Sequence, residues 1–138
     1  MQVKQYDIDD INLGDTASFS KTWNEKDLEL FAALSENINP LHIDEEYART
    51  TIFGARIMYG MHVAVLSSTL VGVYLPGKRC LCLKQDLQFK KPIYVGDTVL
   101  TTGTITKKSK STRIITVSII ITKGNDEIVT GDMTVKLL

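Results

Sequence analysis

The chain has 138 residues, the size of one domain that can bury a single core. Sixteen basic and sixteen acidic side chains leave it without net charge, so no global field would attract nucleic acid or an anionic membrane surface. We therefore expect one domain over residues 1–138 and no nucleic-acid partner.

The amino terminus, MQVKQYDIDD, has no apolar run and becomes acidic at once, unlike a secretory signal or a transit peptide. We therefore expect a cytoplasmic protein. Cys80 and Cys82 are too few and too badly spaced for a disulfide framework or a zinc site, so we expect reduced thiols and no metal.

Helical periodicity begins in TWNEKDLELFAALSEN, where Thr22 and Glu25 match a capping box and predict a helix start. Asp44 would cap a second, short helix over the EEYA turn that follows it. Residues 57–75 are apolar enough to suggest a membrane span, but their histidine, serines and glycines favour a fully buried helix. We therefore expect a long central helix and no membrane partner.

From residue 81 onward the apolar pattern has a period of two, which is typical of strands. Three further strand-like segments follow, at about residues 97–107, in RIITVSIIIT and in EIVTGDMTVKLL. In the first strand the side chains expected on one buried face are Leu81, Leu83, Leu87 and Phe89. A long helix followed by antiparallel strands predicts an α+β fold in which the sheet wraps around the helix.

A candidate acid or base is His42, which follows the dipeptide Asn39-Pro40. Pro40 fixes its own φ and keeps Asn39 out of the helical region, so His42 would be presented at a defined angle. This is how a positioned acid or base is built. From the local pattern alone, an ordinary histidine after a helix stop remains an alternative.

A second candidate element is YGM, residues 59–61, at the start of the apolar helix. Gly60 would let a ligand approach the backbone, and the positive end of the helix dipole would favour an oxygen that gains negative charge. Ser68, two turns further on, could reach the same pocket. The alternatives are a glycine needed only for packing and a serine bonded to its own helix.

Taken together, these segments resemble a known family, the MaoC-like (R)-specific enoyl-CoA hydratases of the hot-dog superfamily, especially the small single-domain ones linked to polyhydroxyalkanoate synthesis. The matching stretches are FAALSENINPLH, FGARIMYGM, LVGVYLPGK, LQFKKPIYVGDTV and VTGDMTVKLL. The resemblance implies a hot-dog fold, a homodimer with its sheets joined edge to edge, and a tunnel for trans-2-enoyl-CoA near the dimer interface. It implies no cofactor beyond the coenzyme A of the substrate.

The resemblance also assigns roles to individual residues. His42 matches the histidine that activates water together with an aspartate, and Gly60 matches the glycine whose N–H polarises the thioester carbonyl. Ser68 matches a serine that lines the site. Asn39 matches an asparagine that fixes the loop, and we place it with the substrate-binding residues.

Two positions depart from the family pattern. Asn37 stands where the catalytic aspartate is expected, and an amide cannot accept a proton from water at neutral pH. Tyr59 stands where a histidine usually precedes Gly-Met. His62 is a candidate partial substitute if it faces the tunnel, although an ordinary buried helix histidine fits the same position. We assign Tyr59 and His62 to substrate binding, and Asn37 to catalysis with His42.

The sequence therefore predicts a lyase of fatty acid metabolism, a reversible enoyl-CoA hydratase and 3-hydroxyacyl-CoA dehydratase impaired or altered by Asn37. A non-catalytic protein that binds acyl-CoA or acyl-carrier-protein thioesters is the alternative, and a thioesterase is a third. Two basic clusters, residues 76–79 and 107–113, are candidates for contacts with the phosphates of coenzyme A.

Overall fold

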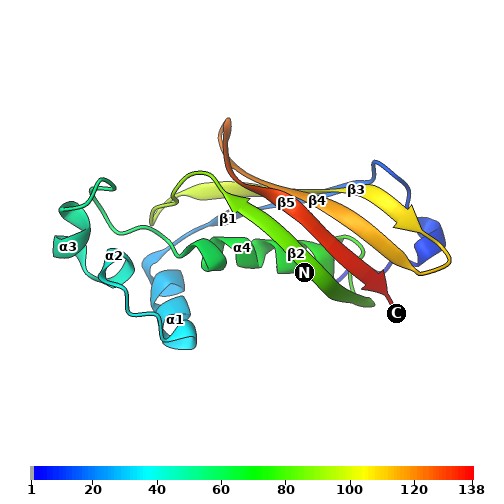
Figure 1. The fold of residues 1–138 in the computed structure, drawn as a ribbon, viewed down its shortest axis with the longest axis horizontal. Coiled ribbons are helices and arrows are strands. Elements are labelled where there is room, and N and C mark those ends of the chain that lie inside the picture. Colours follow the sequence, from blue (N-terminus) through cyan, green and yellow to red (C-terminus); the bar gives the residue numbers. More distant parts are fainter. Residues whose placement is uncertain (1) are drawn as a thin grey trace.

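A curved, five-stranded antiparallel sheet forms the body of the protein in a computed structural model that describes residues 2–138 (Figure 1). The strand order is β1-β3-β4-β5-β2. The strands are β1 (Thr16–Thr22), β2 (Cys80–Phe89), β3 (Thr98–Ser109), β4 (Ile114–Lys123) and β5 (Asp126–Leu137).

The central helix α4 (Gly60–Thr69) lies along the sheet and continues into a π-helical turn, η2 (Leu70–Tyr74). Three further helices lie together beyond one end of the sheet (Figure 1): α1 (Glu25–Ser35), α2 (Pro40–Ile43) and α3 (Glu45–Arg49). A 3-10 turn, η1 (Ile8–Asp10), precedes β1. The predicted α+β arrangement, an antiparallel sheet around a long helix, is confirmed.

The core forms where the inner face of the sheet meets α4. Val63 and Leu66 of α4 and Leu70 of η2 are buried in one cluster with alternate side chains of β4 and β5. The four β5 residues that share this buried face are Val129, Met133, Val135 and Leu137. Burial of each such side chain stabilises the fold by about 1.5–3 kcal/mol relative to exposure.

None of the helices in residues 2–138 is long and apolar enough to cross a membrane. The apolar run at residues 57–75 is instead the central helix with its flanking turns, largely covered by the sheet. The predicted cytoplasmic location stays a prediction.

The N-cap predicted for the first helix, Thr22, was wrong, because the N-cap in the structure is Asn24. Thr22 is the last residue of β1, and the helix begins at Glu25 with Asn24 as its N-cap. The capping box joins Asn24 and Asp27: the Asn24 side chain accepts from the Asp27 N–H at 3.0 Å, and the Asp27 carboxylate accepts from the Asn24 N–H at 3.0 Å. The N-cap predicted at Asp44 is confirmed, with its carboxylate 3.0 Å from the Tyr47 nitrogen.

The buried face predicted for residues 81–89 is also wrong, because this strand, β2, contains a bulge at Leu83. Its pairing with β5 shifts register between Cys82 and Lys84. One extra residue exchanges the two faces of a strand, so Cys82 lies opposite buried Val135 while Leu81 lies opposite exposed Lys136. Leu81 and Leu83 are exposed. Of the later half of the predicted face, Leu87 packs against the core, whereas Phe89 on the same face remains 50% exposed.

Strand β1 was not predicted. Its sequence, TASFSKT, offers two apolar side chains and otherwise small or charged residues, so its alternation is weak. Antiparallel pairing with β3 holds it in the sheet, and its two apolar side chains, Ala17 and Phe19, pack against the core.

Candidate active site

His42 is held by α2, where a loop was expected. Pro40 stands at the first turn, and the Asn39 side-chain oxygen caps the helix by accepting from the Leu41 N–H at 3.0 Å. The ring Nδ1 of His42 lies 2.8 Å from the carbonyl oxygen of Ile57. Because a carbonyl only accepts, Nδ1 must carry the hydrogen, and Nε2 of the neutral ring keeps its lone pair. His42 therefore presents Nε2 as a base.

Asn37 lies in the exposed turn between α1 and α2. Glu36 ends α1 with a φ of 55°, a left-handed conformation that is uncommon outside glycine, and so turns the chain sharply before Asn37. The side-chain oxygen of Asn37 accepts from the Asn39 N–H at 3.1 Å. The two asparagines thus accept from successive backbone N–H groups of the turn that leads into α2, the helix that carries His42.

Tyr59 is buried between the loop and the central helix. Its hydroxyl donates to the backbone carbonyl of Asn37 at 2.6 Å, and its ring lies against His42 with a centroid distance of 3.9 Å. Burial raises the pKa of Tyr59, so its hydroxyl remains a neutral donor. Tyr59 therefore connects the two predicted catalytic positions, 37 and 42.

Gly60 opens α4, and the N-cap before it provides no side-chain acceptor for the first helical amides. Those N–H groups and the helix dipole make this end of α4 suitable for an oxygen that gains negative charge. A Cβ at position 60 would lie 3.3 Å from the ring of Phe89. The absence of a side chain therefore leaves the backbone accessible beside that ring.

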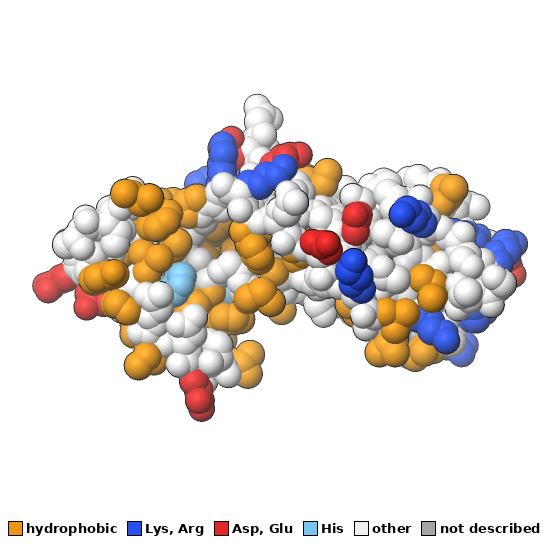
Figure 2. All heavy atoms as spheres, in the orientation of Figure 1, with side chains coloured by type: hydrophobic (Ala, Val, Ile, Leu, Met, Phe, Trp, Pro, Cys, Tyr) orange, Lys and Arg blue, Asp and Glu red, His pale blue; other side chains and the backbone are white. Residues whose placement is uncertain are grey.

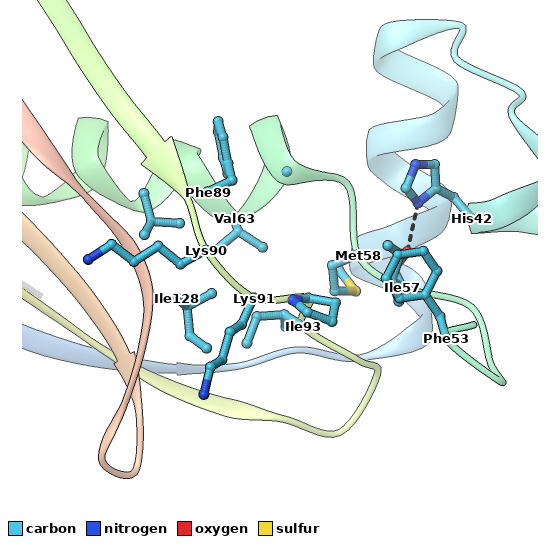
Figure 3. Close-up of a pocket in the computed structure, with 13 residues that line it drawn as sticks. His42, Phe53, Ile57, Met58, Val63, Phe89, Lys90, Lys91, Ile93 and Ile128 are labelled. Atoms are coloured by element: carbon cyan, nitrogen blue, oxygen red, sulfur yellow. Dashed lines mark hydrogen bonds between the residues drawn. The ribbon is translucent and has the colours of Figure 1, made fainter. Parts of the chain in front are cut away.

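His42 and Gly60 line one cavity of about 260 Å³ (Figure 3). Its remaining walls are mainly apolar, with two lysines from the segment after β2. They comprise Phe53, Ile57, Met58, Val63, Phe89, Lys90, Lys91, Pro92, Ile93, Ile128 and Val129. Hydrophobic side chains also surround a histidine on the surface near α1–α3 (Figure 2). The cavity suits an apolar chain that ends in a polar, reactive group.

The other wall residues were not singled out from the sequence. Phe89 was predicted only as part of a buried strand face, and Lys90 and Lys91 belong to a stretch noted only for its resemblance. Ile128 and Val129 reach the cavity because β5 pairs with β2. Lys90 and Lys91 pair with Glu127 and Asp126, each at 2.5 Å. Pairing between distant segments carries no local signal, so composition could not have revealed this wall.

His62 does not line this cavity. It is packed between Phe31, stacked at 4.7 Å, and Trp23, edge-on at 4.6 Å, and its Nδ1 has no hydrogen-bond partner within residues 2–138. Burial lowers the pKa of His62, an effect that nearby Asp27 partly offsets. The single chain therefore places His62 in an aromatic cluster under α1.

Ser68 is exposed and also lies outside the cavity of its own chain. Its neighbour Ser67 is buried and donates to the carbonyl of Ala64 at 2.7 Å. The two basic clusters lie at the end of the sheet away from α1–α3 (Figure 1), where Lys110 pairs with Asp9 and Arg113 with Asp7. Neither cluster lines the cavity.

The described residues contain no group of three or more His, Cys, Asp or Glu side chains placed to hold a metal ion. The chemistry available at the cavity is that of an imidazole base and a helix N-terminus, because Asn37, Asn39 and Tyr59 are not among the residues that line it. The expectation that no cofactor is needed stays a prediction.

Fold and site together define a hot-dog protein with a histidine-containing loop over the start of its central helix. The family described as MaoC like domain matches residues 11–125. The chain is 41% identical to the (R)-specific enoyl-CoA hydratase of Aeromonas caviae, over 92% of this chain and 96% of that protein. It is 39% identical to the enzyme of the same name from Rhodospirillum rubrum, over 93% of this chain and 89% of that protein.

Solved structures of two hydratases superpose on this chain. The (R)-hydratase from A. caviae involved in PHA biosynthesis superposes with a TM-score of 0.89, covering 93% of this chain and 98% of that one. The unliganded R-hydratase PhaJ1 from Pseudomonas aeruginosa, 29% identical, gives a TM-score of 0.93 over 99% of this chain and 88% of that one. The protein belongs to the MaoC-like family, and the predicted hot-dog fold is confirmed.

Proposed function

We propose that the protein is an (R)-specific enoyl-CoA hydratase, a lyase that adds water reversibly to trans-2-enoyl-CoA. One observation carries the proposal: the His42 imidazole, with Nε2 free to accept a proton, shares an apolar cavity with the Gly60 end of α4. Base and oxyanion donors thus border a space that suits an acyl chain. The names of the A. caviae and R. rubrum relatives support the same reaction.

In the proposed reaction a water oxygen bonds to C3 of the enoyl thioester while Nε2 of His42 takes one of its protons. The C2–C3 π electrons move toward the thioester carbonyl, and the resulting enolate oxygen is stabilised by the Gly60 amide. The His42 imidazolium then returns the proton to C2. The product is a 3-hydroxyacyl-CoA, with water fully accounted for and the imidazole neutral again.

Because position 37 is an asparagine, His42 is the one group proposed to act as both acid and base in this reaction. Its amide can orient water by hydrogen bonds but cannot take up the proton. The loss of a general acid or base commonly costs about 10²–10⁴-fold in rate, while substrate positioning and oxyanion stabilisation remain. We therefore propose a hydratase that is slow, or altered in its dependence on His42.

The test is hydration of crotonyl-CoA, followed by the loss of enoyl absorbance, in the native chain and in His42→Ala. We expect turnover in the native chain and a fall of about 10²-fold or more in the variant. Free thiol is measured in parallel, because its release would indicate thioester hydrolysis instead. Equal rates in the native chain and the variant would exclude His42 as the base.

The second candidate is an acyl-thioester binder without turnover, and Asn37 is the observation that favours it. Such a protein would keep the cavity and the Gly60 amide but lack the second proton-transfer group. It would bind crotonyl-CoA, as measured by calorimetry, without any change in enoyl absorbance.

We further propose that residues 1–138 act as one domain that forms a homodimer. The single contiguous core supports the first statement. For the second, β2 is an edge strand, and helix α4 exposes Met61 and Val65, which are 64% and 47% accessible, on the same face as Ser68. A second copy would cover this face, so the predicted role of Ser68 would depend on association.

A further inference from the structure

Residues 57–60, which lead into α4 and include its first residue, contact both His42 and Asn37. The carbonyl of Ile57 accepts from the His42 ring at 2.8 Å, and the hydroxyl of Tyr59 donates to the carbonyl of Asn37 at 2.6 Å. Gly60, the next residue, opens α4, whose first amides are the proposed donors to the enolate oxygen. The geometry of the site is therefore set by this short segment.

Tyr59 is the member of the segment with contacts to most of the site. Its side chain is 2% exposed, so it does not reach solvent. The ring is enclosed by His42 at 3.9 Å and by Phe31 of α1 at 4.9 Å, centroid to centroid. Its backbone is the N-cap of α4, adjacent to Gly60. A shift of Tyr59 would displace Asn37, His42 and the Gly60 amide relative to one another.

We infer that Tyr59 is a positioning residue for the proposed hydration, with its hydroxyl fixing the main chain at Asn37 and its ring supporting His42. This role differs from the substrate contact predicted from the sequence, because the hydroxyl is already bonded to a backbone carbonyl and the ring is buried. The kinetic part of the inference rests on the proposed function. The structural part of the inference concerns the order of residues 36–43 and does not rest on the proposed function.

The kinetic test is a double-mutant cycle with Tyr59→Phe and Asn37→Ala, using crotonyl-CoA. Tyr59→Phe removes one oxygen and keeps the ring that contacts His42 and Phe31. We expect kcat to fall about tenfold with KM changed less than about twofold, because misplaced groups lower the rate of the chemical step. In the Asn37→Ala background the same change should cost less than about twofold, because the group that it positions is gone. Equal losses in both backgrounds would overturn the inference.

Hydrogen exchange tests the structural part without any turnover. The amides of Asn39, Leu41 and His42 are bonded within the loop, at 3.0–3.1 Å. In Tyr59→Phe we expect faster exchange at residues 36–43 and unchanged protection of β4. The matched control is Tyr94→Phe, which removes a hydroxyl that donates to the Phe53 carbonyl at 3.2 Å and should leave exchange at residues 36–43 as in the native chain.

The two measurements separate the two hypotheses. Native-like exchange at residues 36–43 in Tyr59→Phe would overturn the positioning role, whatever the kinetics. Faster exchange in a chain that never hydrates crotonyl-CoA would support the positioning of the loop by Tyr59 while the proposed function fails.

Discussion

The side chain of Asn37 is already bonded to the backbone of Asn39, two residues further on. Its oxygen accepts from the Asn39 N–H, so the amide nitrogen is the group left to meet a water molecule, and that nitrogen only donates. A carboxylate in the same place would keep one oxygen on the Asn39 N–H and offer the other as a proton acceptor. The loop is therefore compatible with aspartate without rearrangement.

We accordingly predict that Asn37→Asp raises kcat for crotonyl-CoA hydration by about 10²-fold, within the range for an added acid or base. Melting temperature should change little, because the turn is kept. The control is the double variant Asn37→Asp with His42→Ala, which should lose most of the gain. An unchanged kcat in Asn37→Asp would mean that His42 alone handles both protons.

The burial of His62 predicts how the stability of the fold depends on pH. Burial between Phe31 and Trp23 lowers its pKa below the ordinary 6.5, with Lys21 acting in the same direction and Asp27 against it. The unfolded chain therefore binds a proton more readily than the folded chain. As pH falls below about 6.5, protonation favours the unfolded state, and this loss stops once His62 titrates within the fold.

The measurement is the urea midpoint at about pH 7.5 and about pH 5.5. We expect the native midpoint to fall over this interval and the His62→Gln midpoint to fall less, although the variant will be less stable at both values. Parallel changes in the two proteins would show that other groups control the pH dependence.

For individual residues, the sequence motifs correctly predicted two of the residues that line the cavity. His42 and Gly60 were both predicted as site residues, and both line the cavity. Helix periodicity alone could not decide which face of α4 turns inward, so His62 and Ser68 could not be placed. Both lie outside the cavity in the single chain.

Among the elements, β2 shows how one residue changes a whole strand. The bulge at Leu83 reverses the facing of the side chains before and after it. No sequence feature distinguishes a bulge from regular alternation in LCLKQDLQF, which is why the period of two was recognised but the buried face was assigned incorrectly. The strand itself, its length and its antiparallel pairing were predictable.

The contact between α4–η2 and β3 depends on Gly103. A Cβ there would lie 2.2 Å from Cδ2 of Leu70 and 3.0 Å from Cγ1 of Val117, both fully buried. We predict that Gly103→Ala lowers the free energy of unfolding by about 1–3 kcal/mol, because the surrounding core cannot move away freely. Urea denaturation measures this change.

Gly72, in η2 on the same continuous helix, is the matched control. No heavy atom lies within 4 Å of a Cβ built there. Gly72→Ala should therefore be neutral or stabilise the protein by up to about 1 kcal/mol, through the lower flexibility of the unfolded chain. Equal destabilisation by the two substitutions would argue against close packing at Gly103.

For the molecule as a whole, the proposed dimer would cover the apolar side chains that α4 exposes at Met61 and Val65. An edge strand and an apolar helix face on one protein favour association with another copy. The fold class was predictable because one long apolar run and several alternating runs leave few arrangements. The assembly was expected only from resemblance, since surface exposure cannot be read from a sequence.

We predict that the native chain runs as two copies of 15.4 kDa in light scattering, and that Val65→Lys converts it to one. Val65 is 47% exposed on α4, so a lysine there costs the single chain little and would place a charge in the interface. Leu13→Lys, at a 65% exposed position before β1, is the control and should stay dimeric. A native chain of one copy would contradict the proposal.

The cavity has two walls with separate origins along the chain. The lining residues from His42 to Val63, which include His42 and Gly60, belong to one continuous segment, whereas the opposite wall comes from residues 89–93 and 128–129. Substitutions in the second wall can change the size of the acyl group accepted while the first segment stays intact. Substrate range and reaction type can therefore diverge independently during evolution of this fold, and chain-length libraries can be confined to the sheet side of the cavity.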